Sequence, residues 1–535
     1  MLNLSSPGLS DYYLIQGECP KNLKTGNFYS YYTAPASLLP LPLMVISRAV
    51  NGAKVASDRF SFSILSAFAG ACIGPLLLAF YFRLRIPLKK ALAWTFVFAV
   101  GTLWWPCSET VFDQCQHGVA LLAITLTAYD AAKGGRLGSA FVTGLLGGLL
   151  YNYRVPFAAL LPVFPIYWIL EARRTSNGAA MTKRTVGWQT VVFAVGVGIG
   201  LAGYAYYNFI RFGQVNMPPI DSGVPMTANP IFGFLTLIVS PGKGVFWFSP
   251  PLILAAFGIS SLIKADLGLG RLVVILSILH VGEMSCVSFA GGDWCWGPRY
   301  LLAIMPLWAL AFPFIPAQAV KRWIVYSLVA AGVIVQLMAV SIENHRFFYY
   351  NRMRPHFWLD KWAYFRISQL LSRPAEILES IEQRDRYRPK VNSSPSGEAT
   401  YCPFGPPGHV DASERPKPKL LPTSHGKSPL EMLASGAGAK RLLGRTAKPP
   451  AKRLAPPDPR TWQEQFRMFY LPRPWWGWIN HVPVDQRPVN PLGFLAVCCI
   501  TTGLGAGMLG FAVRGQSGAD EPPPEDDASP EEMAS

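Results

Sequence analysis

The chain has 535 residues, of which 51% are apolar, 13% are aromatic and only 15% are charged. Soluble domains carry about 25% charged residues, so this composition argues against a soluble globular enzyme and excludes a disordered, collagen-like or coiled-coil chain. The formal net charge is +17. Because polytopic membrane proteins concentrate Lys and Arg in cytoplasmic loops and near anionic lipid, we expect membrane lipid and no nucleic acid as the partner of this charge.

The apolar residues come in blocks of about 20, the length that a helix needs to cross the hydrocarbon core of a bilayer. We therefore predict an all-α fold, a polytopic membrane bundle of about eleven transmembrane helices. The predicted spans are residues 60–83, 91–106, 113–131, 137–152, 155–171, 187–208, 245–264, 271–289, 299–317, 321–341 and 491–513.

Cationic residues occur at every second connection between these blocks, as the positive-inside rule requires of cytoplasmic loops. They are Arg83, Arg85, Lys89, Lys90, Lys133, Arg136, Arg173, Arg174, Lys183, Arg184, Lys264, Arg271, Lys321 and Arg322. A short stretch at residues 34–50, which contains three prolines, would break this alternation if it were a span. We predict instead that it forms a helix in the outer membrane interface.

This orientation divides the chain into five parts. They are a first extracytoplasmic loop at 1–59, a transmembrane core at 60–341, a largely irregular extracytoplasmic segment at 342–490, a final span at 491–513 and an acidic, disordered cytoplasmic tail at 514–535. The composition of the long extracytoplasmic segment is not uniform. Residues 343–387 and 461–488 are rich in aromatic residues and Arg, which suits packing against the membrane surface. Residues 388–460 are rich in Pro, Gly, Ser and Lys, which predicts a disordered basic linker.

Polar residues that hydropathy does not explain gather at the predicted outward loops and helix ends. Glu109, Asp113 and His117 follow one another at intervals of four residues, so a helix through them would carry all three on one face. Arg154 lies at a predicted outward turn. Lys243 lies in the string SPGKG before a predicted helix start, where backbone N–H groups and the helix dipole favour an anion.

A further outward string, GGDWCWGPRYL at 291–301, contains Asp293, Trp296, Arg299 and Tyr300. Arg is suited to bidentate phosphate contact, and Trp is suited to the lipid interface. The chain has no GxGxxG, GxSxG or HExxH motif, no kinase motif set and no Cys/His cluster at zinc spacing. We therefore predict one outward-facing cavity that a lipid can reach from the membrane, with cations that bind phosphate and carboxylates that act as a general base. Such a cavity suits a lipid-linked donor.

The same residues also have structural interpretations. Aromatic residues at helix ends form interfacial belts in many membrane proteins. Lys243 and Arg299 are also suited to snorkelling toward lipid headgroups. Asp113 and His117 are also suited to a solvated helix end or an internal hydrogen-bonded pair, and His280, inside a span, either lines a polar interior or pairs within the bundle.

Four strings resemble bacterial membrane proteins of the GT-C glycosyltransferase superfamily, in particular its protein O-mannosyltransferase and aminoarabinose transferase branch. They are GGDWCWGPRYLLAIMPL, SPGKGVFWFSPPLIL, GNFYSYYTAPASLLPLP and GLLGGLLYNYRVPFAALLP. The resemblance covers residues 20–345 and, less closely, the string FYLPRPWWGW and the final span. The family places a transmembrane helix immediately before its catalytic loop, and this sequence starts after that point.

The resemblance implies a multi-pass protein of the bacterial inner membrane that uses a polyprenyl-phosphate-linked sugar at the outer face. It assigns the catalytic base to Asp11, although the surrounding Ser10-Asp11-Tyr12 is less acidic than the motif of the family. It places Glu109 and Asp113 where some members bind a metal through an acid, so a divalent metal is the cofactor that it suggests. It places Lys243, Arg299 and Tyr300 at the donor phosphate.

The leading hypothesis is therefore glycosyl transfer to an unidentified glycan, lipid or protein acceptor. Asp11, or else Asp113, deprotonates the acceptor. The departing lipid phosphate is stabilised by Lys243, Arg299, Tyr300 and Arg154, and the other predicted site residues are Glu109, His117, Asp293 and Trp296. Two alternatives are a polyprenyl-lipid transporter or flippase, and a non-catalytic membrane scaffold that holds partners through residues 342–490.

Overall fold

The computed structural model describes residues 38–51, 55–110, 113–174, 182–215, 226, 228–287, 295–316, 318, 320–341, 347, 365 and 368–382. Within these ranges 83% of the residues lie in helices and none lies in a strand. The all-α prediction is thus confirmed for this part of the chain. The predicted linker at 388–460, the final span at 491–513 and the tail at 514–535 lie outside the described residues.

The first half of the described chain forms a series of helices joined by short turns. They are α3 (Leu41–Asn51), α4 (Val55–Arg83), α5 (Leu88–Gly101), α6 (Trp104–Ser108), α7 (Gln114–Gly134), α8 (Leu137–Tyr153), the 3-10 helix η1 (Val155–Leu160), α9 (Val163–Arg174) and α10 (Lys183–Phe212).

The second half contains more short helices. They are α11 (Pro230–Ile238), α12 (Val245–Phe248), η3 (Pro250–Leu252), α13 (Ile253–Ala265), α14 (Leu267–Ser285), η4 (Arg299–Ala303), α15 (Met305–Ala309), η5 (Phe312–Phe314), α16 (Arg322–Ser341) and α19 (Gln369–Glu382).

Five helical stretches are long and apolar enough to cross a membrane. They are Leu65–Arg83, Val155–Arg174, Lys183–Phe212, Leu267–Ser285 and Arg322–Ser341. Two shorter apolar stretches, Pro250–Ala265 and Met305–Phe314, accompany them. Since about 20 apolar helical residues span the hydrocarbon core of a bilayer, these helices indicate a membrane protein.

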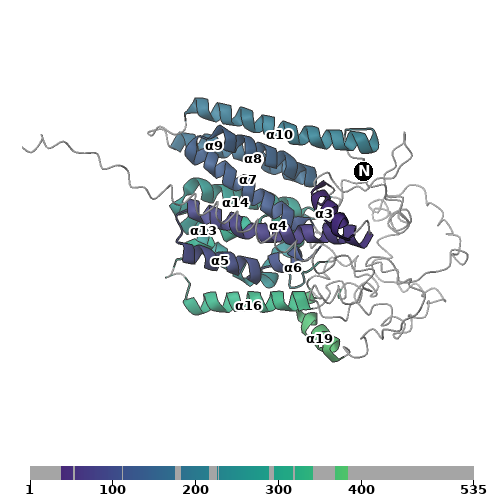
Figure 1. The fold of residues 1–535 in the computed structure, drawn as a ribbon. Coiled ribbons are helices and arrows are strands. Elements are labelled where there is room, and N and C mark those ends of the chain that lie inside the picture. The colour runs from purple at the N-terminus through teal and green to yellow at the C-terminus, as the bar shows by residue number, and fades with distance from the viewer. Residues whose placement is uncertain are drawn as a thin grey trace, which may run out of the picture. The chain divides into compact units, whose positions relative to one another are not determined.

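The long helices run side by side (Figure 1), with α7 in the interior and α10 and α16 at the edges. α7 packs against α4, α8, α9 and η4 and is buried on most of its surface. In contrast, only 28% of the apolar window in α10 and 22% of that in α16 is buried. The exposed apolar faces of α10 and α16 are suited to contact with lipid.

Prolines divide two of the predicted spans into short helices. The span predicted at 299–317 consists of η4, α15 and η5, and Pro306 and Pro313 are the second residues of α15 and η5. The span predicted at 245–264 consists of α12, η3 and α13, with Pro250 and Pro251 at the break. Proline lacks the N–H that a helix interior needs, and its ring clashes with the preceding turn, so a new helix begins there.

Three elements, two outside the predicted core and one within it, differ from the prediction. A helix does form in the described part of the stretch 34–50: it is α3, which begins at Leu41. The region 343–387, predicted to be part of a largely irregular segment, contains the 14-residue helix α19, which packs against α16. α11, which begins at Pro230 with Asn229 as its N-cap, was not predicted as an element.

Ion pairs join the helix ends on the side of the bundle where the predicted cytoplasmic loops lie. Lys133 Nζ, near the end of α7, lies 2.8 Å from Asp266 and 3.4 Å from Glu171. Glu171 also pairs with Arg174, and the Tyr129 hydroxyl donates to Asp266. We call these five residues the Asp266 network.

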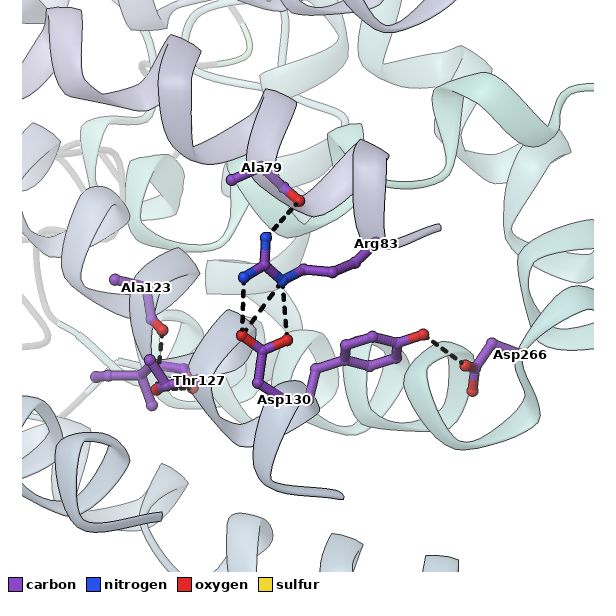
Figure 2. Close-up of polar contacts among 8 residues, drawn as sticks. Ala79, Arg83, Ala123, Thr127, Asp130 and Asp266 are labelled. Carbon is purple, nitrogen blue, oxygen red and sulfur yellow. Dashed lines mark hydrogen bonds and ion pairs between the residues drawn. The ribbon is translucent and has the colours of Figure 1, made fainter. Parts of the chain in front are cut away.

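A second ion pair lies beside the Asp266 network, as Figure 2 shows. The Arg83 guanidinium at the end of α4 donates to both carboxylate oxygens of Asp130 on α7, at 2.9–3.2 Å. Together with the Asp266 network, this pair brings the ends of α4, α7 and α9 and the start of α14 to one end of the bundle. The cation clusters at 83–90, 133–136, 173–184 and 264–271 therefore lie at the same end, in agreement with the predicted alternation.

Glycines allow α8 and α10 to approach each other closely. An added Cβ at Gly196 of α10 would lie 2.6 Å from the backbone of Leu145 and Phe141 on α8, and one at Gly200 would lie 2.6 Å from Gly148. Gly198, on the same helix, faces open space. Small residues at such positions are the usual way for two helices to pack by backbone contact within a membrane.

We predict that Gly196→Ala lowers the unfolding free energy by about 1–3 kcal/mol, because the added methyl group must push two backbones apart. Gly198→Ala adds the same methyl group where nothing lies within 4 Å, so it should leave stability unchanged or raise it slightly through better helix propensity. Unfolding by SDS titration in mixed micelles, followed by circular dichroism, measures both. Equal effects of the two changes would contradict the close packing.

Candidate functional site

Four polar side chains from three separate segments come together at the end of the bundle opposite the Asp266 network. Asp113 directly precedes α7, His117 lies one turn into α7, and Arg154 lies between α8 and η1. One carboxylate oxygen of Asp113 lies 3.5 Å from His117 Nε2 and 3.6 Å from an Arg154 guanidinium nitrogen. Arg299, the first residue of η4, acts on the same carboxylate electrostatically. We call these four residues the Asp113 cluster.

The His117 ring is backed by an aromatic layer. It meets Tyr153 edge-on with ring centroids 4.9 Å apart and Phe157 edge-on at 5.2 Å. Phe157 in turn stacks on His280 at 5.5 Å, with the two rings nearly parallel. His280 Nε2 lies 2.9 Å from the backbone oxygen of Tyr300, and since a carbonyl oxygen only accepts, Nε2 donates. The aromatic layer thus connects α7, through η1 and α14, to η4.

Arg299 and Tyr300 open η4, and their side chains contact each other. The Arg299 guanidinium carbon lies 5.3 Å from the centroid of the Tyr300 ring. Because the face of an aromatic ring attracts a cation, Tyr300 helps to hold this guanidinium near the Asp113 carboxylate. Arg299 and Tyr300 are residues of intermediate exposure, although Nε of Arg299 is buried, and the Arg154 side chain is 45% exposed. Three of the four predicted phosphate-binding residues, Arg154, Arg299 and Tyr300, therefore have some exposed surface.

Lys243 has a different environment from the anion cradle that the sequence predicted. Its side chain is buried, and Nζ donates to the backbone oxygens of Cys295 at 2.7 Å and Gly297 at 3.2 Å. The backbone N–H groups of Lys243 and Gly244 bond to Ser240, and the helix that follows has only four residues. The cradle is thus filled by contacts within the protein, and Lys243 holds the turn at 295–297.

Glu109 does not share a helix face with Asp113 and His117, so the prediction from the four-residue spacing is wrong for this residue. α6 ends at Ser108 and α7 begins at Gln114, so no single helix carries all three side chains. Glu109 Oε1 accepts a hydrogen bond from Trp105 Nε1 at 3.0 Å. The spacing does hold for Asp113 and His117, whose side chains meet.

Trp296 is buried, and the contact that covers it comes from a helix that the sequence analysis did not connect with the site. The guanidinium carbon of Arg373, on α19, lies 4.9 Å from the centroid of the Trp296 ring. The Gly297 N–H donates to Gln369 Oε1 at 3.4 Å, and Ser368 Oγ donates to the Pro241 carbonyl at 2.6 Å. The beginning of α19 therefore contacts both loops that carry predicted phosphate-binding residues.

Two predicted site residues cannot be placed: Asp11 and Asp293 lie outside the described residues. Among the residues that are described, no group of three or more His, Cys, Asp or Glu side chains is arranged to hold a metal ion. Asp113 is within reach of cations and a histidine and not of a second described acid. The divalent metal thus stays a prediction from the family resemblance alone.

The electrostatics of the Asp113 cluster favour an ionised carboxylate. Burial raises the pKa of Asp113, but the charges of His117 and Arg154 outweigh this effect, and Arg299 adds to them. The pKa of the carboxyl therefore lies below its usual range. A carboxylate held so firmly in its ionised form is a weak base, so Asp113 is better suited to orienting the two guanidinium groups than to removing a proton.

We predict that Asp113→Asn lowers the unfolding free energy by about 1–3 kcal/mol, because the charged partners of this buried group lose their carboxylate. The depressed pKa also gives the wild-type protein a stabilising contribution that is complete above the unfolded pKa of about 4 and is lost as the pH falls further. Unfolding in detergent between pH 3 and 7 checks both effects. The unfolding free energy of Asp113→Asn should lack the loss at low pH that the wild-type protein shows. The same pH dependence in both proteins would contradict the ion pairs of Asp113.

The comparisons with known proteins do not assign the site to a family. No protein-family model, no curated protein and no solved structure matches the chain significantly. The chemistry of this site must therefore be argued from its own residues and from the motifs that carry them.

Proposed function

We propose that the chain is an integral membrane glycosyltransferase that uses a polyprenyl-phosphate-linked sugar as its donor. One observation carries the proposal: Asp113 pairs with Arg154, and η4, which begins at Arg299, packs against α7 and is joined to it through His117, Phe157 and His280. These three motifs, far apart in the sequence, meet at one end of a bundle of membrane-length helices. Two of these motifs are strings on which the GT-C resemblance depends, those around Arg154 and Arg299.

The position of the site along the bundle supports a substrate at the membrane surface. Asp113 precedes α7 and Lys133 lies near its end, twenty residues later. At 1.5 Å per residue, this separation is about 30 Å, the thickness of the hydrocarbon core. The Asp113 cluster therefore lies about one membrane thickness from the Asp266 network. Since the Asp266 network lies among the cation-rich connections, the Asp113 cluster belongs to the extracytoplasmic side in the proposed orientation.

Arg154 and Arg299 are the residues that we assign to the donor phosphate. A guanidinium group presents paired N–H donors that match phosphate oxygens, and its charge persists at every relevant pH. Both side chains are partly exposed, whereas the Lys243 ammonium is buried against two carbonyl oxygens. Lys243 therefore supports the loop, and phosphate binding falls chiefly to the two arginines.

In the proposed reaction, an acceptor oxygen forms a bond to the anomeric carbon of the sugar. The bond between that carbon and the phosphate oxygen breaks, and its electron pair stays on the polyprenyl phosphate. The two guanidinium groups stabilise the charge that develops there. The proton of the acceptor passes to a general base, for which the family resemblance implies Asp11. Asp113 keeps the guanidinium groups in position through its charge.

The proposed activity implies a specific topology and location for the chain. We propose eleven spans in a GT-C arrangement, the bacterial inner membrane as the location and the outer face as the site of reaction. The five membrane-length helices and the common end of the cation clusters support a polytopic protein. The acceptor is a glycan, lipid or protein with a nucleophilic oxygen.

We predict that Arg299→Ala reduces sugar transfer by about 10²- to 10³-fold, the usual cost of removing one donor that stabilises a developing oxyanion. Transfer is measured in proteoliposomes that contain a radiolabelled polyprenyl-phosphate sugar and a candidate acceptor extract. Arg136→Ala, which removes an exposed cation at the opposite end of the bundle, should leave the rate unchanged. Full activity of the Arg299 variant would overturn the assignment.

The same proteoliposomes separate transfer from transport. A flippase would redistribute the labelled lipid between the leaflets and leave the sugar on its phosphate. A scaffold would do neither and would depend on residues 342–490. Redistribution without transfer, or neither activity with several acceptor classes, would reject the glycosyltransferase proposal.

A further inference from the structure

α19 follows α16 in the chain and packs against it, and its first residues and Arg373 also contact two loops of the core. Arg373 is fully buried. Its guanidinium lies over Trp296, and one of its nitrogens lies 3.6 Å from Glu376 on the next turn of α19. Burying an arginine costs far more free energy than exposing it, unless its charge is stabilised where it lies. The Trp296 ring and the Glu376 carboxylate are two of the groups that stabilise the buried charge of Arg373.

The indole of Trp296 makes ring contacts with its neighbours and no described hydrogen bond. Its Nε1, which is buried, has no hydrogen-bond partner among the described residues. The ring instead meets Phe248 edge-on, with centroids 5.0 Å apart, on one side and the Arg373 guanidinium at 4.9 Å on another. Without a directional hydrogen bond, the orientation of this ring depends on its two neighbours.

Gly297 fixes the turn from the other side. It has a φ of +64°, in the left-handed region that favours glycine, and an added Cβ would lie only 3.0 Å from Phe248. Its N–H donates to Gln369, and its carbonyl oxygen accepts from Lys243 Nζ and from the backbone N–H of Arg299. Each polar backbone group of Gly297 thus has a fixed partner, and Gln369 lies one turn before Arg373 on α19.

These contacts lead directly to Arg299, which lies three residues after Trp296 and two after Gly297. We propose that Arg373 is a positioning residue: through the Trp296 ring and the turn at 295–299, it sets where the Arg299 guanidinium lies in the Asp113 cluster. Ser368, which donates to the Pro241 carbonyl, fastens the same helix to the loop of Lys243. α19 thereby couples the segment after the core to the site.

The first test measures how often the turn at 295–299 opens, and its result does not depend on the proposed function. Cys295 in the turn and Cys115 on α7 are both buried, so their alkylation by a maleimide reports local opening. Rates for each peptide are measured by mass spectrometry in the full-length protein in nanodiscs. We expect Arg373→Met to raise the rate at Cys295 about tenfold, the order of a desolvated cation–π contact, and to leave Cys115 unchanged. Arg373→Lys, which keeps the charge, should recover part of the protection.

Leu371→Ala is the matched control, because this side chain lies on the same helix and is 79% exposed. It should change neither rate. An unchanged rate at Cys295 in Arg373→Met would overturn the proposal. Equal increases at Cys295 and Cys115 would also overturn it, because they would show a loss of global stability instead of a local effect on the turn.

The second test rests on the proposed function and uses binding of a polyprenyl monophosphate to the protein in nanodiscs. If Arg373 acts through Arg299, then Arg373→Met weakens binding about tenfold in the wild-type background. In an Arg299→Ala background it should weaken binding by no more than about twofold, because the shared effect is already lost. If Arg373→Met weakened binding by the same factor in the wild-type and the Arg299→Ala backgrounds, the proposal would be overturned. Absence of binding by the wild-type protein would reject the proposed function, and the alkylation rates would then decide the role of Arg373 alone.

Discussion

A charge within a bundle of membrane helices must be paired, and this constraint determines where the polar residues of the described chain lie. Moving an isolated ion into a medium of low dielectric costs several kcal/mol or more, so ionisable groups are tolerated where a partner is within reach. At one end Lys133 meets two carboxylates from two other helices, and at the other Asp113 meets a guanidinium from the end of α8. Both sets of pairs join α7 to its neighbours. The interior helix is therefore fixed at its two ends by charge.

Much of the fold could be predicted because its cause lies in composition and spacing. Apolar blocks of membrane length predict the helices, and cations at every second connection predict which helix ends lie together. The pairs of Lys133 with Asp266 and Glu171 bear this out in the described residues. What the spacing could not provide is the effect of proline. An apolar block such as 299–317 has the hydropathy of a span, but Pro306 and Pro313 divide it into short helices.

The candidate site was predictable residue by residue only where local sequence sets the contact. Asp113 and His117 meet because they lie one helical turn apart, whereas Glu109 fails the same rule because α6 ends before it. The approach of Arg154 and Arg299 to Asp113 depends on how helices pack, which no spacing encodes. The contact of Arg373 was even harder to predict, because its partner Trp296 lies in a distant segment of the sequence. The residues around Arg373 show only the pattern of an amphipathic helix. The sequence analysis predicted an irregular segment here, although the spacing of Leu370, Leu371, Ile377 and Leu378 was a signal that could have indicated the helix.

The two polar ends differ in the geometry of their pairs, and this difference bears on which of them binds a ligand. At the end that carries the Asp266 network, the Lys133–Asp266 and Arg83–Asp130 pairs are 2.8 and 2.9 Å long, and of the described ion pairs there only the two pairs of Glu171 are longer, at 3.4 Å. In the Asp113 cluster the corresponding distances are 3.5 and 3.6 Å, too long for strong directional bonds. Attraction over such distances depends weakly on orientation, so Arg154 can turn toward an incoming anion and lose little of its interaction with Asp113. A short bidentate pair such as Arg83–Asp130 would have to break first. The looser end is thus the one at which a guanidinium can exchange a carboxylate for a phosphate most easily, as the proposed use of a lipid-linked donor requires.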